Sequence, residues 1–428
     1  MEKAMTLEPP VRIENRTQLV YLLSEAAELE HGISCCYLFA GFSLKSSTKE
    51  GVSDQQLQMI EDWRSTITDV AIQEMLHLGL VNNLLTAIGG APHIRRPNLP
   101  TSPAMYPKSF ELDLRPFNPQ TLANFIFLER PETVMSQDPA TLAANRPQPR
   151  HVRARDIFFD RPEYQTIGHL YRGVEDGFRY LAEKYGEERL FIGSSTTQAA
   201  AYPRLPELTA VTGLLSAIQA IQQIVEQGEG APGEAQNGHY ARFRRIQEEY
   251  EALRRQDPNF APARPVVVNP YTHLPADLID ARKVNVLDDP LTVSICNLFD
   301  GAYELLIQML GRYFARIDEL EEDLRLLGEI TVGIMGRVIG PLGNAITGLP
   351  AGPSHPGLHA GPSFYIPRNV HTPPHRRAPW LAWRERLLEL SAYCAILEIS
   401  AGAPAEMVRI GQTLARLAGR ISEKTPGK

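Results

Sequence analysis

Two long segments of helical periodicity in the first ninety residues constrain the fold of this chain more than any other feature. In the first, apolar residues recur at helical spacing between residues 19 and 40, and Thr17 is the expected N-cap. In the second, the same spacing runs from residue 60 to residue 85, with Ser53 as the expected N-cap, until a pair of glycines ends it. Helices of this length are typical of a bundle, so the sequence predicts an all-α fold.

Proline interrupts the helical pattern between residues 91 and 162. Twelve prolines fall in this stretch, which excludes long uninterrupted helices there. One short helix is expected around residues 122–129. The stretch is therefore interpreted as a long crossover that packs on the outside of the bundle.

The helical pattern returns after the crossover and defines the expected domains. Two helices, at about 165–185 and 206–227, are expected to pair with the first two and complete a four-helix bundle, and a polar amphipathic helix follows at 239–255. The expected division is then a bundle domain over 1–262, a proline-rich linker over 263–290 and a C-terminal helical region over 291–428. A short strand is expected in the linker at 266–268. In the C-terminal region, helical stretches at 291–338 and 380–421 flank a loop rich in histidine and proline at 350–379.

The charge balance and the cysteine count exclude several classes of protein. The chain carries 43 lysine and arginine residues against 50 aspartate and glutamate residues, a net charge of −7, which argues against binding to nucleic acid or to an anionic membrane. Its four cysteines are too few for a disulfide framework and form no Cys-x-x-Cys pair. Neither a signal peptide nor an apolar run of about 18 residues is apparent. A cytoplasmic protein is therefore expected.

Side chains that bind metals lie within the apolar faces of the first two helices. Glu30 has alanine, isoleucine and tyrosine as its neighbours at helical spacing, and a buried carboxylate without a partner is costly. Glu74 and His77 are spaced i, i+3 on the second helix, so one carboxylate and one imidazole point the same way. A glutamate on one helix and Glu-x-x-His on the next make half of a carboxylate-bridged dimetal site. Glu74 and one glutamate of the fourth helix are the expected bridges, with Glu30 and Glu175 as the expected terminal ligands.

The second helix pair is expected to supply the other half of the site. Glu175 lies on the third helix with apolar neighbours, and Glu226 and Glu229 are spaced i, i+3 at the end of the fourth. Glu229 stands where a second Glu-x-x-His would place histidine, and His239 at the start of the next helix is the alternative source of a nitrogen ligand. The sequence leaves both residues as candidates.

The same residues resemble a known superfamily. Residues 26–40, with Glu30 seven positions before Tyr37, are similar to the first helix of ferritin-like proteins. Segments 74–78, 224–230 and 239–243 resemble the ferritin-like domain family linked with iminophenyl-pyruvate dimer synthases. The resemblance implies a ferritin-like four-helix bundle, a non-haem metal pair, and oxidative chemistry on an imine or amino-acid-derived substrate in secondary metabolism.

The favoured hypothesis is an O2-dependent oxidoreductase with two iron ions, for which oxygen-rich ligation also allows manganese. Tyr37 is the candidate catalytic residue, because a phenol near the metals can hydrogen-bond a ligand or relay an electron. The expected partners are O2 and a small-molecule substrate, without nucleic acid or membrane, and a homo-oligomer is allowed. The alternative hypothesis is a metal-binding or structural bundle that turns over no organic substrate. The histidines of the 350–379 loop lack helical spacing and are expected to form a solvated loop or a lid.

Overall fold

Helices α1 (Arg16–Ser43) and α2 (Asp54–Ala87) form the central pair of the molecule and pack along most of their length. The side chain of Asn15, two positions before the predicted cap, caps α1 by accepting from the backbone N–H of Gln18, and Ser53 and Gln56 form a capping box at the start of α2. The structure is a computed structural model that describes residues 11, 13–102, 111–131, 164, 166–230, 237–274, 280–316, 319–368, 370–372, 375 and 377–422.

Helices α5 (Ile167–Tyr185) and α7 (Leu214–Glu229) pack against α1 and α2 and complete the four-helix bundle. The short helix α6 (Glu187–Leu190) follows α5. Helix α7 begins eight residues later than the sequence predicted. Tertiary contacts explain the difference. The side chain of Asn83 donates to the carbonyl of Thr209, and the side-chain amide of Gln198 hydrogen-bonds both the carbonyl and the N–H of Val211. The segment before α7 is therefore held outside the helix.

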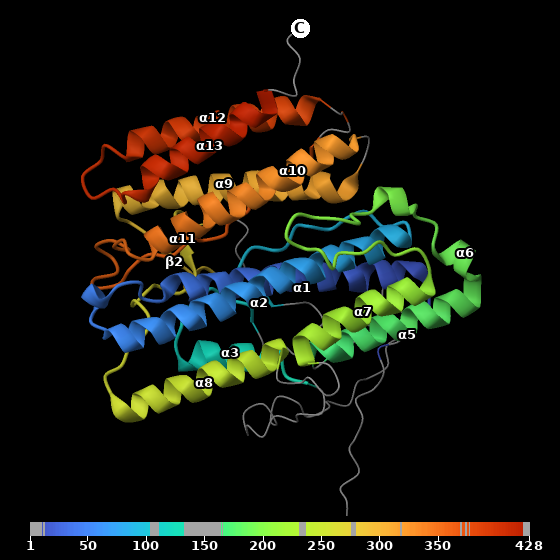
Figure 1. Cartoon of the computed structure of the whole chain (residues 1–428), viewed down its shortest axis with the longest axis horizontal. Helices are drawn as coiled ribbons and strands as arrows, with labels where there is room; N and C mark the ends of the chain where they lie inside the picture. The colour runs from blue at the N-terminus through green and yellow to red at the C-terminus, as the bar shows by residue number, and fades with distance from the viewer. Residues whose placement is uncertain are drawn as a thin grey trace, which may run out of the picture.

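The crossover contributes helix α3 (Pro119–Leu128), which pairs with α8 (His239–Gln256). Figure 1 shows α8 and α3 beneath one end of the α1–α2 pair, while α7 and α5 lie beneath the other end. The end of α7 and the start of α8 therefore both lie beside the middle of α2. Much of the crossover, at 103–110 and 132–163, lies outside the described residues.

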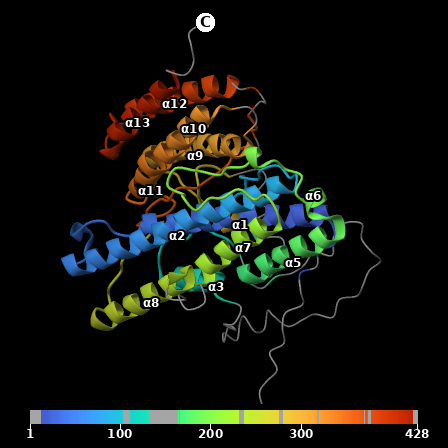
Figure 2. The same ribbon diagram turned by 45° about the vertical axis from the view of Figure 1, so that its right-hand side comes forward.

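The C-terminal region adds two further layers of helices on the opposite face of α1 and α2. Figures 1 and 2 show α9 and α10 above the central pair and α12 and α13 above them. A π-helical turn at Met335–Ile339 joins α10 to α11, which contacts α1. The stretch expected at 291–338 is divided into α9 (Pro290–Ala315) and α10 (Glu321–Ile334) and continues past its expected end into α11 (Gly340–Ile346). The stretch expected at 380–421 is divided into α12 (Ala378–Leu397) and α13 (Glu406–Ser422).

Strand structure among the described residues is confined to a short parallel pair, β1 (Pro270–Tyr271) and β2 (Asn285–Val286). Val266 of the predicted strand at 266–268 forms only an isolated bridge to His359. Single 3-10 turns occur at Thr48–Glu50, Ser195–Thr197 and Ala281–Lys283.

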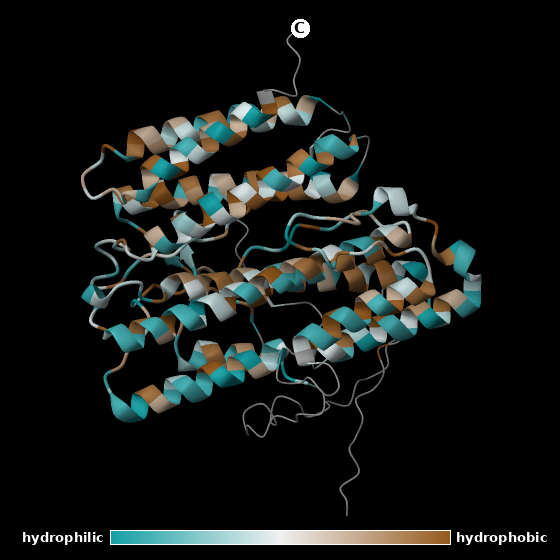
Figure 3. Ribbon diagram, in the orientation of Figure 1, coloured by the Kyte–Doolittle hydropathy of each residue, from teal (hydrophilic) through white to brown (hydrophobic). Residues whose placement is uncertain are grey.

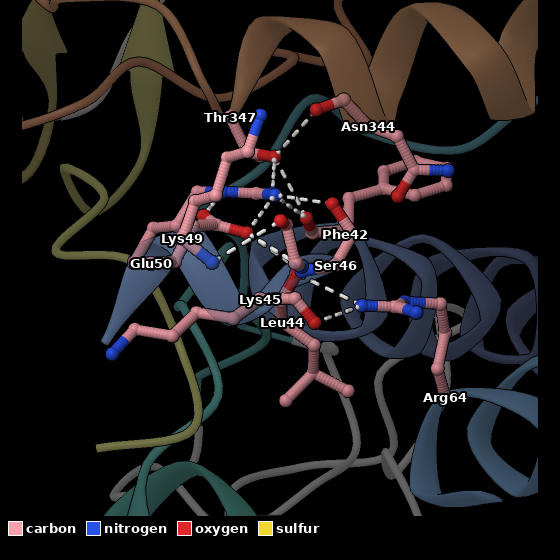
Figure 4. Close-up of polar contacts among 11 residues, drawn as sticks. Phe42, Leu44, Lys45, Ser46, Lys49, Glu50, Arg64, Asn344 and Thr347 are labelled. Carbon is pink, nitrogen blue, oxygen red and sulfur yellow. Dashed lines mark hydrogen bonds and ion pairs between the residues drawn. The ribbon is translucent and has the colours of Figure 1, made fainter. Parts of the chain in front are cut away.

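Arg264 joins the bundle to the C-terminal region. Its guanidinium forms a two-point ion pair with Glu50, at 2.6 and 3.1 Å, and donates to the hydroxyls of Ser46 and Thr347. The Thr347 hydroxyl in turn donates to the carbonyl of Phe42 at 2.7 Å. Figure 4 shows Glu50, Ser46, Phe42 and Thr347 converging at this junction, which connects the ends of α1 and α11.

One continuous apolar core runs through these layers. Figure 3 shows hydrophobic residues concentrated along α1 and α2 in the middle of the molecule, and mostly hydrophilic residues along the outer helix α8. One helical run, Glu321–Ile346, is long and apolar enough to cross a membrane by length and composition alone, and 56% of its apolar window is buried. This run packs on α9 and α13, as a core helix does.

Candidate metal centre

The first group of side chains suited to a metal joins the middle of α1 to the middle of α2. Glu30, Glu74 and His77 are each at most 2% exposed. The imidazole Nδ1 of His77 lies 2.9 Å from Oε2 of Glu74 and 3.6 Å from Oε2 of Glu30. We call these three residues the first ligand group, because one oxygen or nitrogen from each lies within 4.8 Å of the others.

A second ligand group of the same kind consists of Glu74, Glu129 and His239. Glu129 is the C-cap of α3, and His239 is the first residue of α8. Nδ1 of His239 lies 2.8 Å from Oε1 of Glu74 and 3.5 Å from Oε2 of Glu129. All three side chains are buried.

Glu74 belongs to both groups and lies between the two histidines. Its Oε2 faces His77 and its Oε1 faces His239, whose rings are stacked with centroids 5.5 Å apart. A carboxylate with one oxygen in each of two ligand groups is the arrangement of a carboxylate that bridges two metal ions.

The state of the two imidazoles provides a test of whether a metal fits. Nδ1 of His239 is buried and makes no acceptable hydrogen bond with any described residue, although two carboxylates lie beside it. Both nitrogens of His77 face oxygens, which suits either a protonated ring or a ring whose Nδ1 shares a cation with those oxygens. Three carboxylates and two imidazoles are a donor set suited to iron or manganese. The residues therefore fit a pair of metal ions.

A glutamine holds the outer nitrogen of each histidine. Nε2 of His77 donates to Oε1 of Gln227 at 2.9 Å, and Nε2 of His239 donates to Oε1 of Gln73 at 3.1 Å. A hydrogen on Nε2 leaves Nδ1 as the nitrogen with a lone pair, and Nδ1 is the atom that faces the carboxylates. Gln73 and Gln227 thus fix the tautomer that binds a metal.

Two buried tyrosines hold the carboxylates of Glu129 and Glu30. The hydroxyl of Tyr37 donates to Oε1 of Glu129, and the hydroxyl of Tyr171 donates to Oε1 of Glu30. Burial and the neighbouring carboxylates raise the pKa of both phenols well above the usual value, so both remain protonated donors. Each tyrosine leaves the second oxygen of its glutamate directed to a ligand group.

The metal-free charges of this centre are strongly shifted. Burial and the nearby Glu74 carboxylate raise the pKa of Glu30 to about 8. Burial alone would raise the pKa of Glu74 and lower that of His239, but their attraction reverses both effects: the pKa of Glu74 falls well below its usual value and that of His239 rises to about 9. In the metal-free centre, bound protons offset the negative charges of the carboxylates, as a cation does in a metal site.

The structure does not bring every predicted ligand to this centre. Glu175 is half-buried and forms an ion pair with Arg179, one turn further along α5, at 2.6 Å. Glu226 is exposed and, with Gln73 and Gln227, lines a pocket of about 360 Å³ beside the end of α7 and the start of α8. Glu229 is the last residue of α7, and its side chain lies outside the described part of the chain. The sequence left Glu229 and His239 as alternatives for the last ligand, and His239 belongs to the second ligand group.

Glu129 is the site residue that the sequence analysis missed. It follows the apolar run of α3, with Phe125 and Leu128 as buried neighbours, so the signal was a carboxylate at the end of a buried helix. The loop histidines expected to be solvated belong to neither ligand group found among the described residues, and His355 donates to the carbonyl of Val286.

The chain is similar to known proteins of one family. A family model described as Ferritin-like matches residues 23–248, which include all five members of the two candidate ligand groups. The chain is 28% identical over 375 residues to the 2-imino-3-(indol-3-yl)propanoate dimerase of Chromobacterium violaceum, covering 82% of this chain and 34% of that protein. It is 26% identical over 432 residues to the dichlorochromopyrrolate synthase of Lentzea aerocolonigenes, covering 90% of this chain and 40% of that protein.

The chain thus spans only about a third to two fifths of the length of these curated relatives. Among solved structures, a ferritin-like protein from Caulobacter vibrioides matches 72% of this chain and 89% of its own, at 20% identity and a TM-score of 0.46.

Proposed function

The chain belongs to the ferritin-like family, and from this premise we propose that it is a non-haem dimetal oxidoreductase that uses O2 to act on a small organic metabolite. The observation that carries the proposal is the buried carboxylate of Glu74, which belongs to two complete ligand groups. A structural carboxylate needs one partner, whereas this one lies between two histidines and two further glutamates.

The protein's own side chains prepare the site in three ways. Glu30 and Glu129 are the proposed terminal ligands, each held by a tyrosine hydroxyl. His77 and His239 present Nδ1 because glutamines hold Nε2. The surrounding burial excludes bulk water, which strengthens each of these interactions. When bound, a redox-active pair such as di-iron supplies the electrons that reduce O2, and hard carboxylates stabilise the oxidised ions.

Iron is the proposed metal, and manganese is the alternative with the same ligand preference. The names of the curated relatives support an imine or amino-acid-derived substrate and a role in secondary metabolism. The proposed compartment is the cytoplasm, since all four cysteines are buried as free thiols. Tyr37 is proposed as the residue that orients Glu129 and can relay an electron. Association with further copies of the chain is part of the same proposal.

Metal analysis of anaerobically purified protein tests the first step. After reconstitution with ferrous iron, we expect about two ions per chain, because each ligand group supplies three donors. Glu74→Ala should reduce binding at both positions, since both groups lose the shared carboxylate. Fewer than one ion per chain in the unsubstituted protein would contradict the proposal.

Oxygen uptake separates an oxidoreductase from a bundle that only binds metal. The reconstituted protein should consume O2 with an amino acid or imino acid substrate at a rate that Glu74→Ala abolishes. A storage or structural bundle would take up O2 only in proportion to the ferrous iron added, with no further uptake when organic substrates are supplied.

A further inference from the structure

Helices α12 and α13 form the outermost layer of the C-terminal region and expose very different faces (Figures 1 and 2). Large apolar side chains are exposed along α12 and just beyond its end: Leu381, Leu388, Ile396 and Ile399. The exposed face of α13 carries Val408 as its one large apolar side chain and is otherwise mostly polar. Single exposed apolar residues are ordinary, but a cluster of them on one helix marks an interaction site.

The exposed residues of α12 follow the spacing of a helix that packs against another helix. Alternate steps of four and three residues separate Leu381, Glu385, Leu388, Ala392, Ala395 and Ile399, all of which are exposed. This is the spacing of the seam between two helices that lie side by side. The opposite side of α12 is buried against α9 and α13. Helix α12 therefore has two packing faces, and the described residues cover only one of them.

The exposed charges of the two helices have opposite signs. On α12, Glu385 is exposed, and on α13, Arg409 and Arg416 are exposed. None of these three forms an ion pair with a described residue, and the same holds for Glu398, which follows α12. A face that carries acidic residues on one helix and basic residues on its neighbour is complementary to a second copy of itself.

Glu385 and Arg416 lie at the same level of the α12–α13 hairpin. The hydroxyl of Ser391 donates to the carbonyl of Gly411 at 2.8 Å, which places these two residues side by side on the two helices. Glu385 lies six residues before Ser391 and Arg416 lies five residues after Gly411, so both lie towards the open end of the hairpin. The corresponding distances along the helix axes are about 9 and about 7.5 Å.

Ile396 and Val408 lie at a common level on the other side of this reference point. Ile396 lies five residues after Ser391, and Val408 lies three residues before Gly411. These separations correspond to about 7.5 and about 4.5 Å towards the loop that joins the helices. The exposed face thus has one charged pair and one apolar pair, each with its two members nearly level.

We propose that the outer face of α12 and α13 binds the same face of a second copy of this chain, around a two-fold axis parallel to the helices. Such an axis places α12 of one copy on α13 of the other without changing the level of any residue. Glu385 then faces Arg416 of the second copy, and Ile396 faces Val408 of the second copy. The symmetry forms each contact twice.

Charge distinguishes this arrangement from the other two-fold arrangement of the same faces. An axis across the helices would place α12 on α12 and α13 on α13. The arginines of α13, Arg409 and Arg416, would then face the arginines of the second copy, and like charges that face each other oppose association.

The size of the face sets the expected strength of the dimer. Helices of 20 and 17 residues form the face, which is about 25–30 Å long and about 20 Å wide. Its flat area of about 500–600 Å² per copy is at the lower end for specific complexes. We therefore expect a dissociation constant of about 1 μM or above. The face lies beyond the α9–α10 layer from the metal centre (Figure 1), so the inference goes beyond the proposed function and does not rest on it.

Sedimentation velocity of the full chain tests the association. Between about 0.5 and about 100 μM, the weight-average mass should rise from that of one chain towards that of two. A single species of 47.7 kDa over the whole range would overturn the proposal.

A charged residue in the apolar part of the face tests its location. Ile396→Asp should raise the dissociation constant of the dimer at least about tenfold, because it places a carboxylate against Val408 of the second copy. Ile192→Asp is the matched control, since both isoleucines are 61% exposed and Ile192 follows α6, outside this face. Circular dichroism checks that both variants are folded. An Ile396→Asp variant that dimerises as tightly as Ile192→Asp would overturn the proposal.

Exchange of the two charges tests the direction of the axis. Glu385→Arg and Arg416→Glu should each weaken the dimer about fivefold or more, because each places like charges against each other twice. The double variant restores opposite charges and should dimerise within about twofold of the unsubstituted protein. A purely structural role of either residue predicts no such recovery. A double variant that is as weak as the single variants would overturn the arrangement.

Discussion

The carboxylate of Glu74 lies 2.8 Å from Nδ1 of His239, although the two residues come from helices 165 positions apart in the sequence. The contact places the first residue of α8 against the middle of α2. It also completes a second ligand group that the α1–α2 pair alone cannot form. The arrangement of the centre therefore depends on the crossover and on α8 as much as on the two central helices.

Replacing Glu129 with alanine tests the ligand that periodicity did not reveal. The variant should lose about one of two bound metal ions, because only the second ligand group contains this carboxylate. Inductively coupled plasma mass spectrometry of reconstituted protein measures the loss. Glu175→Ala is the matched control, since this carboxylate pairs with Arg179, and it should keep full occupancy. The opposite ranking of the two variants would assign the site to α5.

Replacing the outer glutamines should weaken metal binding without removing a ligand. Gln73→Leu and Gln227→Leu release Nε2 of His239 and of His77, so the tautomer that presents Nδ1 loses its support. We expect about 10- to 100-fold weaker metal affinity in competition with a chelator. Gln219→Leu, an exposed glutamine in the lining of the same pocket, should leave the affinity as it is. Equal effects at all three positions would mean that pocket polarity matters and histidine orientation does not.

Asp300 should make the protein less stable as the pH rises towards neutrality. Burial raises the pKa of this carboxyl from 3.8 to about 7, although hydrogen bonds from Ser363 and Tyr365 and the charge of Arg96 act against the rise. The folded chain therefore binds the extra proton between these two values, so the contribution to stability is present at low pH and is lost as the pH passes through 7.

Equilibrium urea unfolding from pH 5 to 8 measures this effect. Relative to Asp300→Asn, the unsubstituted protein should lose at most about 1.4 kcal/mol of unfolding free energy for each pH unit below the folded pKa. Asp176→Asn, an exposed carboxyl on α5, should leave the slope unchanged. Parallel curves for the unsubstituted protein and Asp300→Asn would contradict the prediction.

Arg264→Ala should destabilise the junction between the bundle and the C-terminal region. The side chain is 10% exposed, and its loss removes the two-point ion pair to Glu50 and the bonds to Ser46 and Thr347. We expect about 1–3 kcal/mol less unfolding free energy, measured by urea titration. Arg282→Ala removes an exposed ion pair to Asp280, which solvent screens, and should leave the unfolding free energy nearly unchanged. A loss at Arg264 no larger than that at Arg282 would show that other contacts hold the junction.

Helical periodicity predicted both the all-α fold and the central half of the candidate site, while the ferritin-like identity came from the resemblance to that superfamily. Helical periodicity identifies the face on which Glu30, Glu74 and His77 lie, and these residues belong to the parts of α1 and α2, about 29–43 and 74–87, that are buried on almost all sides. A carboxylate on such a helix meets other protein atoms whichever way it points, so burial follows from spacing alone.

Periodicity was a weaker guide to the outer helices. Glu175 has the buried Tyr171 and Phe178 at helical spacing, but it lies at the edge of that apolar face, where Arg179 reaches it. Glu129 could not be found by spacing, because its place depends on how the crossover packs against α8. That packing is a contact between distant segments, which local sequence does not encode.

The separation of the ligands along the chain has a consequence for how the protein is made. The first ligand group is complete once the α1–α2 hairpin has emerged from the ribosome, because its last member is His77. The second must wait for His239, and closing so long a loop is the slower step. We therefore expect a nascent chain to assemble the first ligand group before the second.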